Sequence, residues 1–333
     1  MAQAIITRRK GKGVNKDLPE QITAFTAVAD NTPQITLSWE NPTEYWAGTL
    51  IVKKAGSAPE GVNDGEKIYN GTGTTYTDTA VEYDTTYYYR AFPYNAKKQY
   101  QTEVLTVSAM PVAIPDNFAD ATWAQIDAAS TSGNIPSTWV VGSEKDITLS
   151  TGEVLTLVIV GINHDDLADG SGKAGLTIGL KNLMAETRSM NSSNTNAGSF
   201  VGSAMYSWMI GTLMTQLPED LQSVIKTVNK KSAEGGWSST IRTDAIKMFL
   251  FAEIETFGLA QYSVEGEGEQ YSYFTDVANR IKYLSNGSMA KKYWFLRSPI
   301  ESGTTGFCSI GDDGYNHSSS ASKSYGVCFG FCV

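Results

Sequence analysis

The sequence predicts an all-β sandwich over residues 19–110, followed by an α+β domain over residues 116–333. In the first region, short runs of alternating apolar and polar residues recur between turn residues, as in β-sandwiches. The second region contains few helical patterns and many short strands joined by glycine-rich loops, which is typical of an α+β domain. A chain of 333 residues is also long enough for two domains.

The predicted strands of the first region are rich in β-branched and aromatic residues. Turn pairs such as Asn41-Pro42 and Asn70-Gly71 separate them. They cover residues 35–39, 49–53, 67–69, 74–77, 87–92 and 103–107.

Trp39 and Tyr87 make this prediction more specific. Trp39 lies in an early strand, where it can fill the core, and Tyr87 follows residues 83–86 at the position of a tyrosine corner. With these residues the region resembles a fibronectin type III module, an immunoglobulin-like sandwich. The resemblance implies a spacer role. Because the sequence contains no Arg-Gly-Asp tripeptide, it implies no integrin-type contact.

Two short segments flank this module. Residues 1–18 include Arg8, Arg9 and Lys10, and are expected to form an N-terminal arm that serves for attachment. Residues 111–115 begin and end with proline and are expected to form a semi-rigid linker, because proline fixes its own φ angle.

The second region is predicted to begin with a helix that Asp116 or Asn117 caps and that carries Trp123 and Ile126 on one face. Further helices are predicted over residues 204–217 and 219–229, and a short one around 277–284. Strands are predicted over residues 137–141 and 154–161, whereas 173–184 fits either a strand or a helix.

The most informative stretch is residues 293–333. Its two ends, 293–299 and 325–333, are apolar and aromatic and are predicted as buried strands. The run between them consists of small, polar and aromatic residues, a composition used by adaptable binding loops. We therefore predict a scaffold of Trp294, Leu296, Arg297, Val327, Phe329 and Phe331. We predict a ligand-binding face of Ser309, Asp312, Asp313, Tyr315, Asn316, His317, Ser318, Ser319, Ser320, Ser322 and Tyr325, with Tyr315 as its anchor.

Several separated motifs occur in order in the second region. They cover residues 164–175, 217–221, 294–299 (W-x-L-R-S-P) and 326–331 (G-V-x-x-x-F). With them, residues 116–333 resemble a bacterial and prophage domain family without an assigned function. Its fold is similar to the C-type lectin-like fold of formylglycine-generating enzymes and of the variable proteins of diversity-generating retroelements.

This resemblance implies a receptor-binding protein of a phage or prophage tail, made in the bacterial cytoplasm and located in the virion. Its variable-type region would cover about residues 293–333. The implied partners are a host cell-surface receptor, either protein or glycan, and other tail proteins. A homo-oligomer, specifically a trimer, is expected because multivalency strengthens weak contacts.

Two other functional classes stay open. A formylglycine-type enzyme would need a reactive cysteine pair, but Cys328 and Cys332 are poorly spaced for one if both lie in the closing strand. A purely structural tail or cell-surface protein is the other alternative. The odd number of cysteines argues against a disulfide framework, although the sequence leaves a Cys308–Cys328 bridge open.

Other polar motifs are predicted to be structural. The carboxylates of Asp165, Asp166 and Asp169 do not have EF-hand spacing and are expected to cap backbone N–H groups. The glycines of residues 265–269, Glu-Gly-Glu-Gly-Glu, could suggest a phosphate-binding loop, but the three carboxylates would repel phosphate. We therefore expect a solvated loop. Arg297 is expected to pair with a carboxylate or carbonyls beneath the binding face.

The composition excludes several other functions. The net charge of −9 argues against nucleic-acid binding, and no apolar run is long enough for a membrane helix or a signal peptide. Because the chain contains only two histidines, we expect no histidine-rich metal site. We also expect no cofactor and no catalytic activity.

Overall fold

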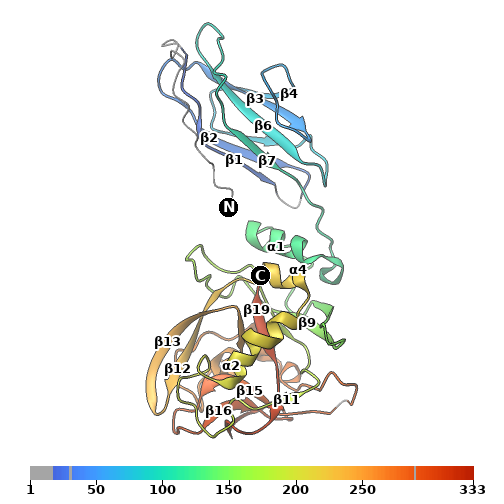
Figure 1. The fold of residues 1–333 in the computed structure, drawn as a ribbon, viewed down its shortest axis with the longest axis vertical. Coiled ribbons are helices and arrows are strands. Elements are labelled where there is room, and N and C mark those ends of the chain that lie inside the picture. The colour runs from blue at the N-terminus through green and yellow to red at the C-terminus, as the bar shows by residue number, and fades with distance from the viewer. Residues whose placement is uncertain (1–17, 30–31, 289) are drawn as a thin grey trace. The chain divides into compact units, whose positions relative to one another are not determined.

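The computed structural model describes residues 18–29, 32–288 and 290–333. The chain divides into two compact units, Met1–Ala113 and Ile114–Val333 (Figure 1). This division falls within residues 111–115, which the sequence predicts as a linker. The predicted arm, residues 1–18, lies outside the described residues except for Leu18.

The first unit is a fibronectin type III-like β-sandwich. One antiparallel sheet has the strand order β1-β2-β5 and the other β4-β3-β6-β7 (Figure 1). The strands are β1 (Thr23–Ala29), β2 (Ile35–Glu40), β3 (Gly48–Ala55), β4 (Glu66–Gly71), β5 (Thr75–Asp78), β6 (Tyr87–Tyr94) and β7 (Thr106–Ala109). The predicted strands are confirmed, although β7 begins later than expected.

The sequence prediction missed β1. Its pairing with β2 is shifted between Thr23 and Thr26, and Ala24 has a positive φ of 49°. Beyond this irregularity the burial alternates, but the inward residues after the buried Phe25 are the small Ala27 and Ala29, whereas Val28 is 56% exposed. The pattern that identifies the other strands is therefore absent from β1.

The tyrosine corner is confirmed. Tyr87 is buried, and its hydroxyl oxygen accepts a hydrogen bond from the backbone N–H of Glu82 at 3.1 Å. Trp39 is 3% exposed and contacts Phe25 and Tyr69 edge to face. Both aromatic residues therefore have the core positions that the sequence indicates.

We expect Tyr87→Phe to destabilise the first unit by about 1 kcal/mol, because the Glu82 N–H loses its acceptor. Calorimetric unfolding of the full chain would measure the change. Tyr88→Phe is the matched control, since Tyr88 is half-buried on the same strand. Equal effects of the two substitutions would contradict the role of the Tyr87 hydroxyl.

The second unit contains two five-stranded sheets and a hairpin. The strand orders are β14-β19-β10-β9-β8 and β11-β18-β15-β16-β17, and the hairpin consists of β12 and β13 (Figure 1). The strands are β8 (Glu144–Thr148), β9 (Val154–Ile162), β10 (Leu176–Leu180), β11 (Thr187–Arg188), β12 (Val228–Gly235), β13 (Ser238–Ile246), β14 (Met248–Leu250), β15 (Trp294–Pro299), β16 (Gly306–Ile310), β17 (Asn316–Ser320), β18 (Tyr325–Gly326) and β19 (Phe329–Cys332).

The helices of the second unit are short. Thr122 caps the first α-helix through a capping box with Gln125, whereas Asn117 caps only a preceding 3-10 turn. The predicted helix over residues 204–217 is confirmed, although its central turn is a π-helix. The helical segments are η1 (Phe118–Asp120), α1 (Trp123–Ser132), α2 (Ala204–Trp208), η2 (Met209–Leu213), α3 (Met214–Gln216), α4 (Glu219–Val224), α5 (Glu253–Phe257), η3 (Ser272–Thr275) and η4 (Val277–Asn279).

Three predictions of secondary structure were wrong. Residues 137–141 form a turn rather than a strand, because the Trp139 N–H bonds the carbonyl of Pro136 and its indole N–H bonds that of Pro115. The helix predicted over 219–229 ends at Val224, and β12 begins at Val228. The helix predicted around 277–284 is only η4, because Lys282 is buried and bonds the carbonyls of Leu180 and Lys181.

The core of the second unit is built around its terminal strand. β19 lies between β14 and β10, and Leu176 and Val333 exchange backbone hydrogen bonds beyond the end of this strand. All six predicted scaffold residues are buried, and Phe331 contacts Trp123 of α1. The predicted buried strand at 293–299 is thus confirmed as β15. The single strand predicted over 325–333 is wrong: β18 belongs to one sheet and β19 to the other, because the chain crosses between them at Val327, whose carbonyl accepts the N–H of Met184. Among the described residues, no helix has the length and apolar character needed to cross a membrane.

Candidate functional site

The predicted binding residues lie on and around the β16–β17 hairpin, at the edge of the second sheet. Within this run, residues 316–320 form the strand β17 rather than a loop, and they pair with Gly306–Ile310 of β16 in a regular antiparallel register. Because successive side chains of a strand point to opposite faces, the predicted set does not form one face. The structure divides it between two faces and two turns.

One face combines His317, Ser319 and Tyr325 around Tyr293. The ring of Tyr293 lies 5.1 Å from that of His317 and 5.3 Å from that of Tyr325, measured between centroids. The Ser319 hydroxyl lies 3.3 Å from the Tyr325 hydroxyl. All four side chains are half-buried, so part of each remains accessible. This small aromatic and hydroxyl surface is called the β17 patch below.

Ser309 does not belong to the exposed surface, and its assignment as a ligand-binding residue needs correction. Its side chain is fully buried on β16, a central strand that is covered on both faces. Its hydroxyl lies 2.8 Å from that of Ser319. Ser309 can therefore support the β17 patch from below but cannot contact a partner directly.

Asn316, Ser318 and Ser320 alternate with the residues of the β17 patch and point to the other face of the strand. The Asn316 amide donates to Glu253 Oε1 at 2.9 Å and to Gln261 Oε1 at 3.1 Å. Glu253 is fully buried, and its other carboxylate oxygen accepts backbone N–H groups from residues 261–263. Asn316 is thus anchored to a rigid loop.

The turn that joins β16 to β17 presents Asp312, Asp313 and Tyr315. Tyr315 is 60% exposed, and its backbone N–H donates to Asp313 Oδ1 at 3.1 Å. Gly314 has a φ of 83°, a value that glycine adopts without strain. Asp313 Oδ1 also lies 3.8 Å from His317 Nε2, which connects the turn to the β17 patch. Tyr315 therefore stands on a well-ordered turn.

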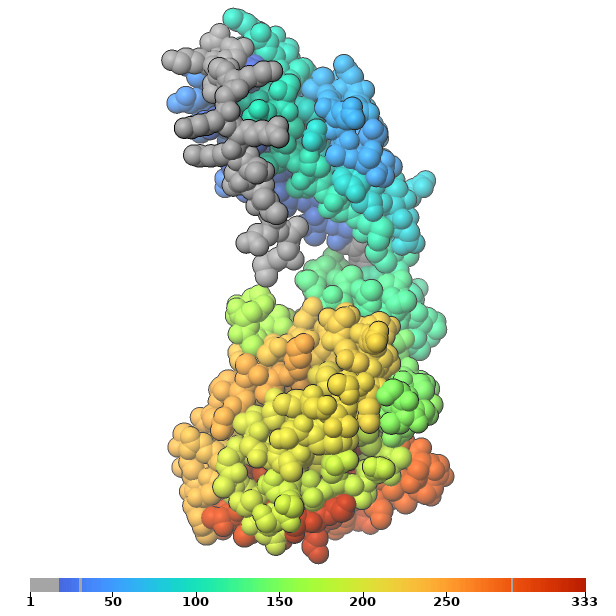
Figure 2. All heavy atoms as spheres, in the orientation of Figure 1, coloured from blue at the N-terminus to red at the C-terminus, as the bar shows by residue number. Residues whose placement is uncertain are grey.

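Ser322 lies in the turn between β17 and β18. Its hydroxyl and its backbone N–H both donate to Asn194 Oδ1, at 2.5 and 3.2 Å. Residues 191–198 thus support this turn from outside the C-terminal run. Figure 2 shows part of the run at the surface of the second unit, where its atoms are red.

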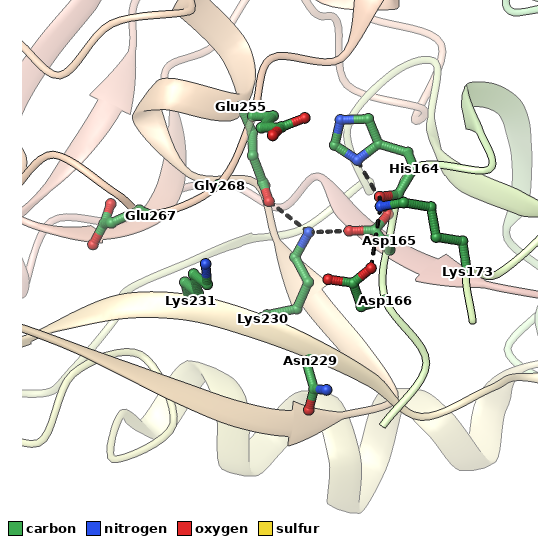
Figure 3. Close-up of a pocket in the computed structure, with 11 residues that line it drawn as sticks. His164, Asp165, Asp166, Lys173, Asn229, Lys230, Lys231, Glu255, Glu267 and Gly268 are labelled. Carbon is green, nitrogen blue, oxygen red and sulfur yellow. Dashed lines mark hydrogen bonds and ion pairs between the residues drawn. The ribbon is translucent and has the colours of Figure 1, made fainter. Parts of the chain in front are cut away.

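A second candidate site is a pocket partly lined by the sequence motif at residues 164–175. It is a cavity of about 110 Å³ lined by His164, Asp165, Asp166, Lys173, Asn229, Lys230, Lys231, Glu255, Glu267, Gly268 and Glu269 (Figure 3). At its base the Lys230 ammonium bonds Asp165 at 2.7 Å, Glu255 at 2.5 Å and the Tyr271 hydroxyl at 2.9 Å. Each N–H of the ammonium therefore has a partner.

Arg297 pairs with a carboxylate and with carbonyls, as the sequence predicts, but it does so through Glu255 of this pocket. Its guanidinium is fully buried and forms two bonds to the Glu255 carboxylate, at 2.5 and 2.8 Å. It also donates to the carbonyls of Lys231, Leu250 and Glu267. These bonds use all the guanidinium donor directions, so Arg297 holds four segments together and has a structural role.

The buried charges at the base of the pocket stabilise one another. Burial alone would raise the pKa of Asp165 and of Glu255, but the nearby cations outweigh it and hold both values below the ordinary range. Lys230 opposes the burial of Asp165, and Arg297 together with Lys230 opposes that of Glu255. Both carboxylates are therefore ionised at neutral pH and are paired with cations.

Glu267 differs from these paired carboxylates. It is fully buried, and burial raises its pKa to about 7. Its Oε1 accepts the N–H of Ala233 at 2.7 Å, whereas Oε2 makes no hydrogen bond with normal geometry. The expectation of a solvated loop holds for Glu265 and Glu269, which are exposed, but is wrong for Glu267.

The aspartates before the pocket have different roles. The Asp169 carboxylate caps the N–H of Ser171 at 2.9 Å, as predicted. For Asp165 the prediction was wrong, because the buried carboxylate pairs with Lys230. The exposed carboxylate of Asp166 pairs with Lys173 at 3.1 Å.

All three cysteines are free and buried, so the Cys308–Cys328 bridge that the sequence left open is not formed. Burial raises the pKa of Cys308, Cys328 and Cys332 above that of an ordinary thiol. At neutral pH these side chains are therefore neutral thiols within the core.

Comparisons with known proteins concern both parts of the chain. Residues 174–333 match the model of a family described as Domain of unknown function (DUF6273). The matched part includes β15 and β19 and the whole of the predicted binding run. No curated protein was found that matches the chain.

Several of the solved structures similar to the chain are fibronectin type III domains. The crystal structure of FN3tt is 15% identical, covers 29% of this chain and 97% of its own, and has a TM-score of 0.24. A fibronectin type-III domain of human fibronectin type III domain containing protein 3 is 17% identical, with coverages of 32% and 97% and a TM-score of 0.24. Domains d3-d4 of the rat CD45 extracellular region are 17% identical, with coverages of 27% and 49% and a TM-score of 0.22.

Sequence reasoning missed three residues that organise these sites. Tyr293 was included in the buried frame, although its ring is half-exposed at the centre of the β17 patch. Lys230 lies in a polar segment, where nothing in the local sequence distinguishes a buried charge from an exposed one. Glu253 had a usable signal, because it follows the apolar run 248–252 directly.

Proposed function

We propose that the second unit is a non-enzymatic ligand-binding head that contacts a host cell-surface receptor. The contact surface consists of the β17 patch (Tyr293, His317, Ser319 and Tyr325) and the turn with Asp312, Asp313 and Tyr315. We further propose that the protein belongs to a phage or prophage tail, in which the fibronectin type III-like unit acts as a spacer.

The observation that carries this proposal is the separation of exposed and buried residues within one short segment. β15 and β19 are buried along their whole length, whereas the polar residues of 312–325 are mostly exposed or half-buried. Truncating a buried aromatic residue costs about 3–5 kcal/mol, but exposed polar positions change stability by less than about 0.5 kcal/mol. The exposed residues of such a segment can be substituted, and its binding partner can change, while the domain stays folded.

Two observations favour binding over an enzyme of the formylglycine type. The buried cysteines are neutral thiols, so they lack the thiolate that such chemistry requires. In the pocket of Figure 3, Lys230 is held by Asp165, Glu255 and Tyr271, which leaves it no N–H for a substrate.

We also propose three further properties: residues 116–333 have a C-type lectin-like fold, a retroelement diversifies the binding run, and the protein assembles into a trimer. An adenine-biased near-copy of the codons for residues 293–333 beside a reverse transcriptase gene would establish the diversification. Light scattering of the full chain would test the trimer.

Binding to cells tests the receptor-binding proposal. We expect Tyr315→Ala and His317→Ala to weaken binding of the fluorescent full-length chain to a panel of bacterial strains by about tenfold or more, as for anchors of other interfaces. Their melting temperatures should stay near that of the wild type, because Tyr315 is exposed and His317 is half-buried.

Tyr45→Ala is the matched control, since Tyr45 is also 60% exposed but belongs to the first unit. It should leave binding unchanged. If the two variants of the second unit unfold the domain, or bind as well as the wild type, the proposed surface is wrong. A wild-type chain that binds no strain would contradict the proposed function itself.

A further inference from the structure

Trp237 is an unusual residue at the tip of the β12–β13 hairpin. Its side chain is 68% exposed, and its φ of 75° lies in the left-handed region. For a bulky residue this backbone conformation is strained, whereas glycine adopts it freely. An indole at this position is therefore not explained by stability or by the geometry of the turn. A role at the protein surface would explain it.

The tip is held firmly beside the loop that joins β15 to β16. The link is Asn196, which is fully buried and whose Oδ1 accepts the N–H of Gly236 at 2.9 Å. Its amide donates to the carbonyls of Gly303 and Gly306, at 2.9 and 3.0 Å. A Cβ at Gly235 would collide with the Asn196 carbonyl, so the approach is close. The backbone next to the indole is thus tied to the loop that precedes β16.

Hydroxyl-bearing residues are frequent in the two segments that meet here. Ser238, Ser239 and Thr240 follow Trp237 along the chain, and residues 302–305, Ser-Gly-Thr-Thr, belong to the loop that Asn196 holds. These residues are exposed or half-buried. The two segments also carry the carboxylates of Glu234, which the Ser238 hydroxyl bonds at 3.0 Å, and of Glu301. Neutral hydrogen-bonding side chains therefore outnumber charged ones in these segments.

We propose that Trp237 and these hydroxyl groups form a carbohydrate subsite, so that the receptor of the proposed function is a cell-surface glycan of predominantly neutral sugars. This inference rests on the proposed function, and it adds the ligand class and a residue outside the C-terminal run. The apolar C–H face of a pyranose ring stacks on the indole, whose π face is electron-rich. The sugar hydroxyls exchange hydrogen bonds with the serine and threonine side chains around it.

The observations favour a glycan over a protein partner. A protein interface usually has a contiguous apolar centre. Here the indole stands alone: among the described residues of the second unit, the other large exposed apolar side chains belong to other elements. They are Val140, Val154, Ile210, Leu259, Val277 and Tyr315. One isolated ring among hydroxyl groups matches the size and chemistry of one sugar.

The experiment uses the full chain and two substitutions at one position. Trp237→Gly should weaken binding to cells by about tenfold or more, while its melting temperature stays the same or rises because the backbone strain is relieved. Trp237→Phe, which keeps an aromatic face, should retain part of the binding. Tyr45→Ala is again the control, since Tyr45 is an exposed aromatic residue with a positive φ of 55° in the first unit.

The ligand class is tested on the cells that bind. Periodate, which cleaves sugars at vicinal hydroxyls, should abolish binding, and protease treatment should not. Purified lipopolysaccharide, teichoic acid or capsular polysaccharide from these cells should compete with binding. If protease abolishes binding and periodate does not, the receptor is a protein and the glycan inference is wrong, although the proposed function stands.

The remaining outcomes separate the two proposals further. If Trp237→Gly binds like the wild type while Tyr315→Ala does not, the subsite is wrong and the proposed surface stands. Loss of binding in Tyr45→Ala would place the ligand on the first unit and overturn both. A wild-type chain that binds neither cells nor the purified polysaccharides would also overturn both.

Discussion

Replacement of Arg297 by methionine is expected to destabilise the second unit by about 3–5 kcal/mol, or to prevent it from folding. The guanidinium is fully buried and bonds Glu255 and the carbonyls of three separate segments. Its removal leaves the Glu255 carboxylate and these carbonyls buried without the hydrogen bonds that the guanidinium donates, and methionine has no N–H or O–H to replace them. Hydrogen exchange in urea, followed by mass spectrometry, would measure the stability of the second unit separately from that of the first.

Arg242→Met provides the control. Arg242 also forms a two-pronged pair, with Asp244, but its side chain is 38% exposed. Exposed ion pairs contribute little, so a loss below about 1 kcal/mol is expected. If Arg297→Met costs no more than this control, the buried network does not hold the domain together.

Glu267→Gln is expected to stabilise the second unit at pH 8 and to have little effect at pH 5. Burial raises the pKa of Glu267 to about 7, above its ordinary value of 4.5. The folded state therefore holds this proton more tightly than the unfolded state does. The free energy of folding that this bound proton contributes is fully present below about pH 4.5 and is lost as the pH rises through 7. The difference between the two pKa values corresponds to on the order of 3 kcal/mol.

Chemical denaturation at several pH values between 5 and 8 would measure this effect. Glutamine keeps an acceptor for the N–H of Ala233 and does not ionise, so the variant should gain on the wild type as the pH rises. Glu265→Gln is the control, because Glu265 is exposed in the same loop. A stability difference between Glu267→Gln and the wild type that stays constant across this pH range would refute the prediction.

The first unit could be predicted almost completely from its sequence. Apolar residues alternate strictly along β2, β-branched and aromatic residues fill β3 and β6, and turn residues separate the strands. Tyr87 and Trp39 then identified the type of sandwich. β1 was the exception, because its inward positions after Phe25 hold the small Ala27 and Ala29 while Val28 is exposed.

The β12–β13 hairpin was missed because its buried face is polar. Lys230 and Ser232 occupy buried positions of β12, so the strand lacks the apolar alternation by which strands are recognised. Gly235 and Gly236 were the available turn signal for a hairpin. The residues that neutralise Lys230 come from 65 and 25 positions away along the chain, and no local pattern reveals them.

For the candidate surface, the composition of residues 300–324 indicated the region but not its geometry. The pairing of β17 with β16 is a long-range property, and it sends Asn316 to one face and His317 to the other. The same pairing buries Ser309 and makes it a support for Ser319. Asn196 ties the hairpin tip that carries Trp237 to the loop before β16, two segments that are distant in sequence.

Local sequence patterns were sufficient to predict the sandwich, the buried strand at 293–299, the burial of most of 325–333 and the position of the polar run between them. These features follow from the local periodicity of apolar side chains, which acts over a few residues. Which charges are buried, which polar residues share a face and which loops meet follow instead from the packing of the whole domain. Those outcomes depend on contacts between distant segments, because a buried carboxylate needs partners: Arg297 and Lys230 for Glu255, and backbone N–H groups of residues 261–263 for Glu253.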